Sequence, residues 1–186
     1  GSGKTNLITK KIQEDARTGR KSLLIVPEQQ TVDVERTMLA LLPPAAQLTF
    51  EAVMEMLLRQ HGIYNQQRHQ HVTEKRAAIQ SDCFRHMHSG ILPLLSALKE
   101  QNIKVGLISN CFSEEAKLIR ESRLFPFFDA PCLSWEEGVR KPDPAIYFRC
   151  MEMLGIPAEN CLYVGDGGSR ELETAAALGM VPVQAT

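Results

Sequence analysis

Short apolar runs alternate along this chain with longer stretches in which apolar residues recur at helical spacing. The strongest apolar runs, rich in aliphatic and β-branched residues, predict buried strands at 22–26, 104–110 and 161–164. Weaker runs predict further short strands at 47–50, 132–135 and 181–183. Helical periodicity predicts helices at 32–42, 51–60, 73–87 and 91–99, with others beginning near residues 113, 140 and 169. This alternation of strands and helices predicts an α/β fold with a parallel sheet.

The end of the 161–164 strand carries a pattern that indicates a binding site. The strand runs into Gly165-Asp166, a glycine pair follows, and a helix is expected to begin near Ser169. In open α/β sheets ligands bind at the carboxyl edge of the strands. Asp166 at that edge, with Glu171 five residues later, suits a hard cation such as Mg²⁺. The alternative is an ordinary strand-to-helix turn with an acidic cap.

The first residues, Gly1-Ser-Gly-Lys-Thr5, followed by a helical pattern, match the second half of a P-loop. In such a loop the backbone N–H groups and the lysine hold phosphates, and the threonine hydroxyl reaches Mg²⁺. We therefore predict that Gly1, Gly3, Lys4 and Thr5 form a nucleotide-binding set. The sequence begins too late to contain the first glycine of the motif, so ATP affinity is expected to be weak.

Residues 1–62 resemble the N-terminus of the B subunit of bacterial AddAB-type ATP-dependent helicase–deoxyribonucleases. The matching stretches are GSGKT, LLIVPEQQTVDVERTML and LTFEAVMEMLLRQHG. The resemblance implies a partial P-loop NTPase-like α/β segment, and it makes a nucleotide-binding or interaction fragment of a DNA-repair helicase–nuclease one hypothesis for function. Residues 63–71 are polar and fit neither helical nor strand periodicity, so we predict a junction there.

Polar side chains at the ends of the predicted elements contain the parts of a phosphate site. Ser109 and Asn110 end one strand and offer hydroxyl and amide donors, and Lys141 offers a compact cation. With the carboxylates of Asp166 and Glu171 to hold a metal, this set could stabilise a phosphoryl group. Each residue also has a simple structural explanation as a cap or a solvated side chain.

From about residue 72 to its end, the chain resembles the haloacid dehalogenase (HAD) superfamily, particularly its phosphatase-like members with a helical cap. The stretches GLISNCFSEEA, VRKPDPAIYFRCMEMLGI and CLYVGDGGSRELETAAALGM match the second, third and fourth motifs of that family. The resemblance implies a Rossmann-like core at 91–186 and a cap remnant at 72–90. It also implies phosphate binding by Ser109, Asn110 and Lys141, and Mg²⁺ on Asp166 and Glu171, where Glu171 replaces the more usual aspartate.

The first motif of the HAD family, an Asp-x-Asp that supplies the nucleophile, is absent from the sequence. Hydrolysis through an aspartyl phosphate is therefore expected to be impaired. We hypothesise that the apolar run 22–26 fills the place of the missing first strand, because a vacant central position would leave buried backbone groups unpaired. Pro27 or Glu28 would then lie near the position of the nucleophile.

Composition limits the remaining choices of function and compartment. Hydrophobic residues make up 44% and charged residues 23%, and the net charge of −1 gives no electrostatic reason to expect nucleic acid or membrane as a partner. Five cysteines without a Cys-x-x-Cys pair argue against a disulfide framework or a zinc site, and favour a reduced, cytoplasmic protein. The leading hypothesis is a HAD-type protein that binds or acts on a phosphorylated small molecule with Mg²⁺. The helicase–nuclease fragment, and a chimeric reading frame without evolved function, remain open alternatives.

Overall fold

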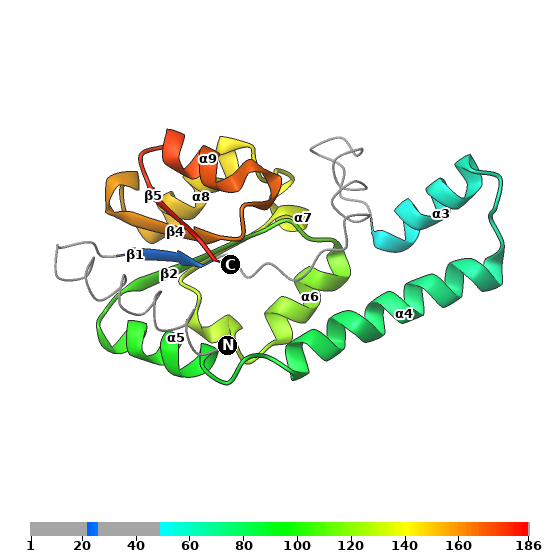
Figure 1. The fold of residues 1–186 in the computed structure, drawn as a ribbon, viewed down its shortest axis with the longest axis horizontal. Helices are drawn as coiled ribbons and strands as arrows, with labels where there is room; N and C mark the ends of the chain where they lie inside the picture. The colour runs from blue at the N-terminus through cyan, green and yellow to red at the C-terminus, as the bar shows by residue number, and fades with distance from the viewer. Residues whose placement is uncertain (1–21, 26–48, 186) are drawn as a thin grey trace.

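The computed structural model describes residues 22–25 and 49–185. Its centre is a sheet of five parallel strands in the order β3-β2-β1-β4-β5. The strands are β1 (Ser22–Ile25), β2 (Lys104–Ser109), β3 (Ala130–Leu133), β4 (Cys161–Gly165) and β5 (Val181–Gln184). The predicted α/β fold with a Rossmann-like parallel sheet is thus confirmed (Figure 1).

Strand β1 occupies the middle of this sheet. It pairs with β2 on one side and with β4 on the other, so that Ser22 lies opposite both Lys104 and Cys161. A strand with parallel neighbours on both sides is normally apolar, and Leu23, Leu24 and Ile25 have that character. The hypothesis that this run supplies the missing strand is therefore confirmed for residues 22–25. These residues belong to the same sheet as the HAD-like half, although they lie within the segment assigned to the helicase resemblance.

The alternation of side chains in β2 and β4 divides the core into two layers. On one face, Ile108 and Tyr163 pack with α8 (Pro144–Leu154) and α9 (Glu171–Ala177). On the other, Val105 and Leu162 pack with α5 (Ile91–Glu100). Figure 1 shows the resulting three layers, with α8 and α9 above the sheet and α5 and α6 below it.

The remaining helices and turns are α3 (Phe50–Gln60), α4 (Gln66–Arg85), α6 (Ser113–Glu121), α7 (Ser134–Glu137), η1 (Phe125–Phe127), η2 (Ala158–Asn160) and η3 (Gly168–Arg170).

The edge strands β3 and β5 each contain a proline, Pro131 and Pro182. Each proline removes one backbone donor from a strand that could otherwise pair with another chain.

One expected strand in the N-terminal half is not formed. The expected strand at 47–50 is replaced at its described end by a helix start, because the Thr49 side chain caps α3 by accepting a hydrogen bond from the Ala52 N–H at 3.2 Å. Within the expected junction at 63–71, the residues from Gln66 onward are helical, because Asn65 caps α4 in the same way through the Arg68 N–H. A domain junction at this place stays a prediction. The polar residues of this stretch lie on a helix that, with α3, extends away from the sheet (Figure 1).

One of two predicted helix starts is displaced. Helix α6 begins at Ser113 as expected, with Phe112 at its cap position, and the Phe112 N–H donates to the Glu115 carboxylate at 2.7 Å. The helix expected from Ser169 begins only at Glu171, because Ser169 and Arg170 have φ of 53° and 52°. A left-handed conformation at two successive residues cannot continue a right-handed helix.

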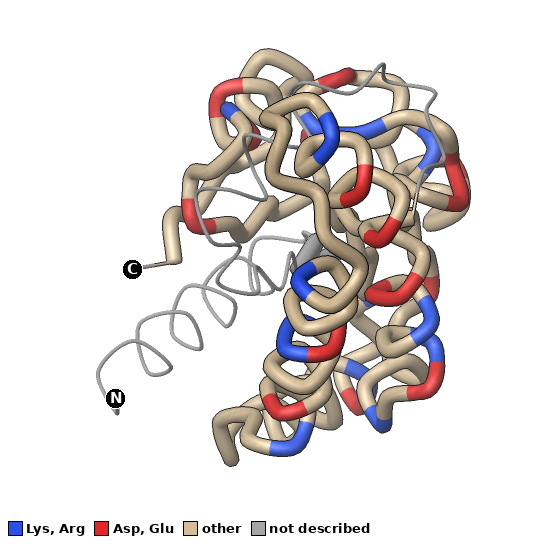
Figure 2. The backbone as a smooth tube through the Cα atoms, turned by 90° about the vertical axis from the view of Figure 1, so that its right-hand side faces the viewer, with Lys and Arg blue, Asp and Glu red and all other residues tan. Residues whose placement is uncertain are grey.

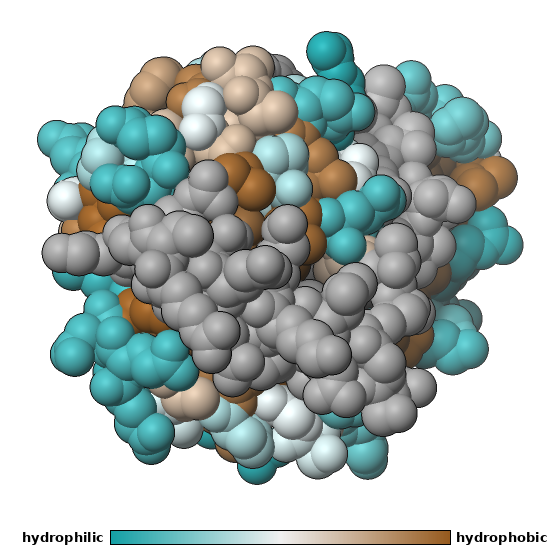
Figure 3. All heavy atoms as spheres, turned by 60° about the vertical axis from the view of Figure 1, so that its left-hand side comes forward, coloured by the Kyte–Doolittle hydropathy of each residue, from teal (hydrophilic) through white to brown (hydrophobic). Residues whose placement is uncertain are grey.

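Charged residues of both signs are mixed over the part of the chain that the structure describes. Figure 2 shows basic and acidic residues interspersed along the described chain, in agreement with the small net charge. On the face in Figure 3, the apolar residues of the described part are scattered among polar ones. Among residues 22–25 and 49–185, none of the helices combines the length and the apolar character that a membrane crossing requires.

The central position of β1 makes a prediction for hydrogen exchange. The backbone amides of Leu23, Leu24 and Ile25 should be protected to a degree similar to those of Leu162 and Val164, because β1 is flanked by a strand on each side. Exchange measured by NMR or mass spectrometry tests this. Rapid exchange in 23–25 beside slow exchange in β4 would contradict the strand order.

The burial of the cysteines makes a second prediction. Cys83 is exposed, whereas the other four cysteines are buried, and burial raises the pKa of the Cys111 thiol to about 12. A raised pKa keeps the thiol protonated at pH 8, and the protonated form is a poor nucleophile. Iodoacetamide should therefore alkylate Cys83 rapidly in the folded protein and all five cysteines only in denaturant, as mass spectrometry would show. Rapid labelling of Cys111 without denaturant would contradict this packing.

Candidate active site

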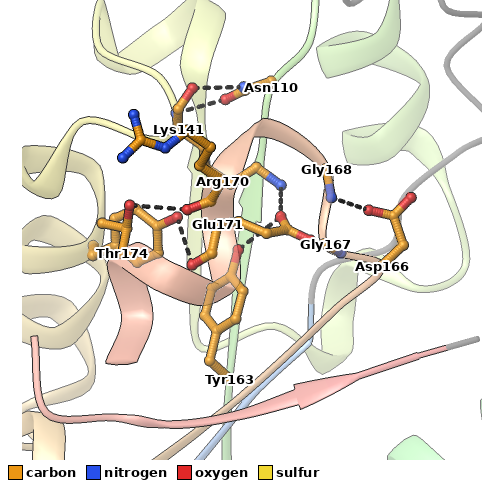
Figure 4. Close-up of polar contacts among 10 residues, drawn as sticks. Asn110, Lys141, Tyr163, Asp166, Gly167, Gly168, Arg170, Glu171 and Thr174 are labelled. Atoms are coloured by element: carbon orange, nitrogen blue, oxygen red, sulfur yellow. Dashed lines mark hydrogen bonds and ion pairs between the residues drawn. The ribbon is translucent and has the colours of Figure 1, made fainter. Parts of the chain in front are cut away.

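The carboxyl ends of β2 and β4 bring the predicted site residues to one edge of the sheet. Ser109 ends β2, with Asn110 next to it, and Asp166 directly follows β4. Lys141 arrives from the segment between α7 and α8, and Glu171 from the first residue of α9. Figure 4 shows Asn110, Lys141, Asp166 and Glu171 gathered in this region. These residues thus converge in space although the first and the last of them, Ser109 and Glu171, are 62 residues apart in the chain.

Asn110 and Lys141 are joined by a reciprocal pair of hydrogen bonds. The Asn110 side-chain Nδ2 donates to the Lys141 carbonyl at 3.0 Å, and the Lys141 backbone N–H donates to Asn110 Oδ1 at 2.8 Å. The amide therefore fixes the backbone from which the Lys141 side chain extends. Because the NH₂ group carries two hydrogens, the predicted phosphate contact of Asn110 stays compatible with this arrangement.

The Lys141 ammonium and the Glu171 carboxylate form a buried ion pair. Lys141 Nζ lies 2.6 Å from Glu171 Oε2, and the two side chains are only 5% and 0% exposed. Glu171 also accepts hydrogen bonds from the Tyr163 hydroxyl at 3.0 Å and from the Gly167 N–H at 3.3 Å. Removing two charges from water is costly, and this geometry with its additional donors offsets the cost.

The space around Glu171 admits no side chain at residue 165. A Cβ on Gly165 would lie 2.1 Å from Glu171 Oε1, far inside van der Waals contact. This close approach explains why glycine must precede Asp166, independently of any turn conformation.

Two tyrosines complete the surroundings of Glu171, and the sequence reasoning missed both. Tyr147 and Tyr163 are fully buried, and the Tyr147 hydroxyl donates to the Glu171 carbonyl at 3.4 Å. Burial raises the pKa of both phenols, so each hydroxyl is a hydrogen-bond donor at neutral pH. A tyrosine within an otherwise aliphatic buried strand signals a hydroxyl that needs a buried partner, and Tyr163 in β4 carried that signal.

Asp166 occupies a tight turn directly after β4. Its Oδ1 accepts a hydrogen bond from the Gly168 N–H at 2.6 Å, its carbonyl accepts one from Gln184 Nε2 at 3.1 Å, and Gly167 has φ of 93°. In Figure 4 the Asp166 side chain extends away from the Lys141–Glu171 pair. The turn thus presents a half-buried carboxylate at the carboxyl edge of the sheet.

The fit of this site to Mg²⁺ depends on Asp166. In the part of the chain that the structure describes, no group of three or more His, Cys, Asp or Glu side chains is arranged to hold a metal ion. Mg²⁺ commonly keeps several waters and takes one or two carboxylates together with substrate phosphates, so Asp166 fits as one such ligand. Glu171 has Lys141, Tyr163 and Gly167 as its partners. A metal-binding role for Glu171 therefore stays a prediction.

Other predicted residues cannot be placed. Gly1, Gly3, Lys4 and Thr5, the predicted ATP-binding set, lie outside the described residues, as do Pro27 and Glu28.

A family profile described as a haloacid dehalogenase-like hydrolase matches residues 9–179. The match includes most of the segment 1–62, and the comparisons give no support to the helicase–deoxyribonuclease resemblance, to a P-loop or to a chimera. The pairing of β1 between β2 and β4 gives the physical reason, because it makes residues 22–25 part of the same sheet.

Curated relatives match this chain over part of their length. Glyceraldehyde 3-phosphate phosphatase from Methanopyrus kandleri is 33% identical over 96 residues, covering 50% of this chain and 41% of that protein. Phosphoglycolate phosphatase from Pseudomonas savastanoi pv. phaseolicola is 33% identical over 114 residues, covering 58% of this chain and 40% of that protein. The chain therefore matches about two fifths of the length of each of these relatives.

Solved structures share the fold over most of the chain. A HAD family enzyme from Bacteroides thetaiotaomicron, in complex with magnesium and inorganic phosphate, has a TM-score of 0.62 at 18% identity and covers 88% of this chain and 93% of that one. A predicted HAD-like family hydrolase from Porphyromonas gingivalis has a TM-score of 0.64 at 17% identity and covers 88% of this chain and 90% of that one.

The buried ion pair predicts a large asymmetry between single and double substitutions. Glu171→Gln leaves the Lys141 ammonium buried without its counter-charge and should reduce the free energy of unfolding by about 3–5 kcal/mol. The double variant Lys141→Met with Glu171→Gln removes both charges and should be clearly more stable than Glu171→Gln alone. Urea denaturation followed by circular dichroism measures the free energy of unfolding of the unsubstituted chain, of Lys141→Met, of Glu171→Gln and of the double variant.

The exposed pair Arg59–Glu55 provides the matched control, because its side chains are 59% and 41% exposed. Glu55→Gln should leave the free energy of unfolding unchanged. Additive effects of the Lys141 and Glu171 substitutions would show that the two side chains do not interact.

Proposed function

This chain belongs to the haloacid dehalogenase-like hydrolase family, and we propose that it binds phosphoryl groups. It binds a phosphorylated small molecule together with Mg²⁺ at the carboxyl edge of its sheet, and its turnover is impaired because the sequence lacks an Asp-x-Asp nucleophile motif. The observation that carries the proposal is the Lys141–Glu171 pair, a fixed buried cation at the same edge as Asp166.

Ser109, Asn110 and Lys141 form the phosphate-binding set. A phosphoryl group carries its charge on equatorial oxygens and is stabilised by donors and cations that are already in place before it binds. Glu171 and the Asn110 amide support this role, because they hold the side chain and the backbone of Lys141 in one position. A lysine held in this way needs little reorganisation when an anion enters.

Asp166 is the residue that would hold Mg²⁺. When bound, the metal would supply positive charge that neutralises phosphoryl oxygens and orients them. The Asp166 turn supports this assignment, because the Gly168 N–H orients one carboxylate oxygen and leaves the group half-buried at the sheet edge. The fold relative from Bacteroides thetaiotaomicron, crystallised with magnesium and inorganic phosphate, adds support for this pair of ligands.

The names of the curated relatives support a class of ligand. The curated relatives are named as phosphatases of glyceraldehyde 3-phosphate and of phosphoglycolate, both small phosphorylated carbon compounds. We therefore propose a small phosphorylated molecule as the ligand.

Glu28, three residues beyond the end of β1 in the sequence, is the candidate to replace the nucleophile, although its longer side chain would approach phosphorus from a different direction than an aspartate.

Binding of inorganic phosphate in the presence of Mg²⁺, measured by isothermal titration calorimetry, tests the proposal. The unsubstituted chain should bind phosphate in a Mg²⁺-dependent manner. Asp166→Asn should weaken that binding at least about tenfold, since removing a charged ligand costs about 1.4 kcal/mol or more. Hydrolysis of p-nitrophenyl phosphate should be slow or undetectable in both proteins.

Asp82→Asn, which changes an exposed aspartate on α4, serves as the matched control and should bind like the unsubstituted chain. Equal phosphate affinity in the Asp166→Asn variant, or the absence of any phosphate binding, would contradict the proposal. Rapid Mg²⁺-dependent turnover that Asp166→Asn abolishes would contradict the proposed impairment alone.

A further inference from the structure

We infer that Arg76, on helix α4, is a positioning residue for the phosphate loop, defined as residues 109–112. The inference rests on the proposed function of that loop. Arg76 lies outside the motifs by which the chain resembles its family, and it belongs to the helical segment that extends from the core. It connects that segment to the loop through buried polar contacts.

The Arg76 guanidinium lies in a closed environment between α3, α4 and α6. Its Nη2 lies 2.9 Å from Glu115 Oε1, and its Nη1 donates to Gln80 Oε1 at 3.0 Å. Its Cζ lies 4.0 Å from the ring centre of Phe50 and 5.3 Å from that of Phe112. The side chain is thus held by an ion pair, a hydrogen bond and two aromatic faces.

Glu115 passes this contact on to the phosphate loop. Its other oxygen, Oε2, accepts the hydrogen bond of 2.7 Å from the backbone N–H of Phe112, the last residue of the loop. Gln80 closes the network by donating to Glu115 Oε1. One carboxylate therefore links Arg76 on α4 to the backbone at the start of α6.

The loop is held at three successive residues by three different elements. The Asn110 amide is bonded to the Lys141 backbone, and the Cys111 N–H donates to Ser134 Oγ at 2.9 Å. Ser134 Oγ in turn donates to the Cys111 carbonyl at 3.2 Å. Phe112 is held through Glu115 and Arg76. Release of the Phe112 restraint would loosen the end of the loop that begins at Ser109, the proposed phosphate donor.

The polarity of the contact distinguishes positioning from simple packing. Arg76 and Gln80 are the buried residues of α4, and both are polar. An apolar contact of the same size would hold α4 without the cost of burying charged groups, but it would not fix the orientation of the helix. Hydrogen bonds and a paired guanidinium fix both distance and orientation, which is the property that an anion-binding loop requires.

Phosphate binding by Arg76 variants, with Mg²⁺ present, tests the inference. Arg76→Met should weaken inorganic phosphate binding about tenfold at a temperature well below its unfolding midpoint. Amide exchange at Cys111 and Phe112 should accelerate in the same variant, while exchange in β4 stays slow. Arg76→Lys keeps the charge but loses the planar contacts to Gln80 and the rings. Its phosphate affinity should lie between that of the unsubstituted chain and that of Arg76→Met. If Arg76→Met does not fold, Arg76→Lys alone tests the inference.

Leu98→Ala provides the control for general destabilisation. Leu98 is 1% exposed on α5, in the core cluster on the face of the sheet away from α8, and its truncation leaves a cavity. It should lower thermal stability while phosphate affinity is retained. Equal phosphate affinity in the unsubstituted chain and both Arg76 variants would overturn the inference and leave the proposed function intact. The same weakening in Leu98→Ala would also overturn it, and absence of phosphate binding in the unsubstituted chain would overturn the proposed function first.

Discussion

The architecture of this protein depends on the pairing of one short strand with two partners. Without β1, the pair β2–β3 and the pair β4–β5 would present unpaired backbone groups to each other across the middle of the sheet. With it, the carboxyl ends of β2 and β4 lie at one edge, with a single strand between them. That arrangement brings Asn110 and Asp166 to the same site.

The site itself consists of layers of support around one lysine. Asn110 fixes the Lys141 backbone, Glu171 fixes the ammonium, and Tyr163 with the Gly167 N–H fixes Glu171. Each layer is buried and directional, so the position of the cation is determined before any ligand arrives. Such preorganisation is more valuable for binding an anion than for stability alone, because a buried ion pair contributes little net stability.

The relation between the helical segment and the core has a similar physical basis. Helix α4 is polar over most of its length and packs on the core with few apolar contacts. Its attachment instead uses the Arg76–Glu115 pair between the rings of Phe50 and Phe112. A helix attached by directed polar contacts keeps one orientation, whereas an apolar surface of this size would allow small shifts. The segment thus acts as part of the site's framework.

The amino-acid sequence by itself determined the parallel α/β class, most strand positions and the residues at the strand ends, because apolar runs and Gly-Asp turns are local patterns. It did not reveal that polar residues 66–71 are helical, since one cap at Asn65 decided that. It did not reveal the ion pair of Glu171 with Lys141, because that contact joins residues 30 apart in the chain. Only the tertiary structure decided that Glu171 is buried against the lysine while Asp166 stays half-buried in the turn after β4, because burial and distance in space set those partners.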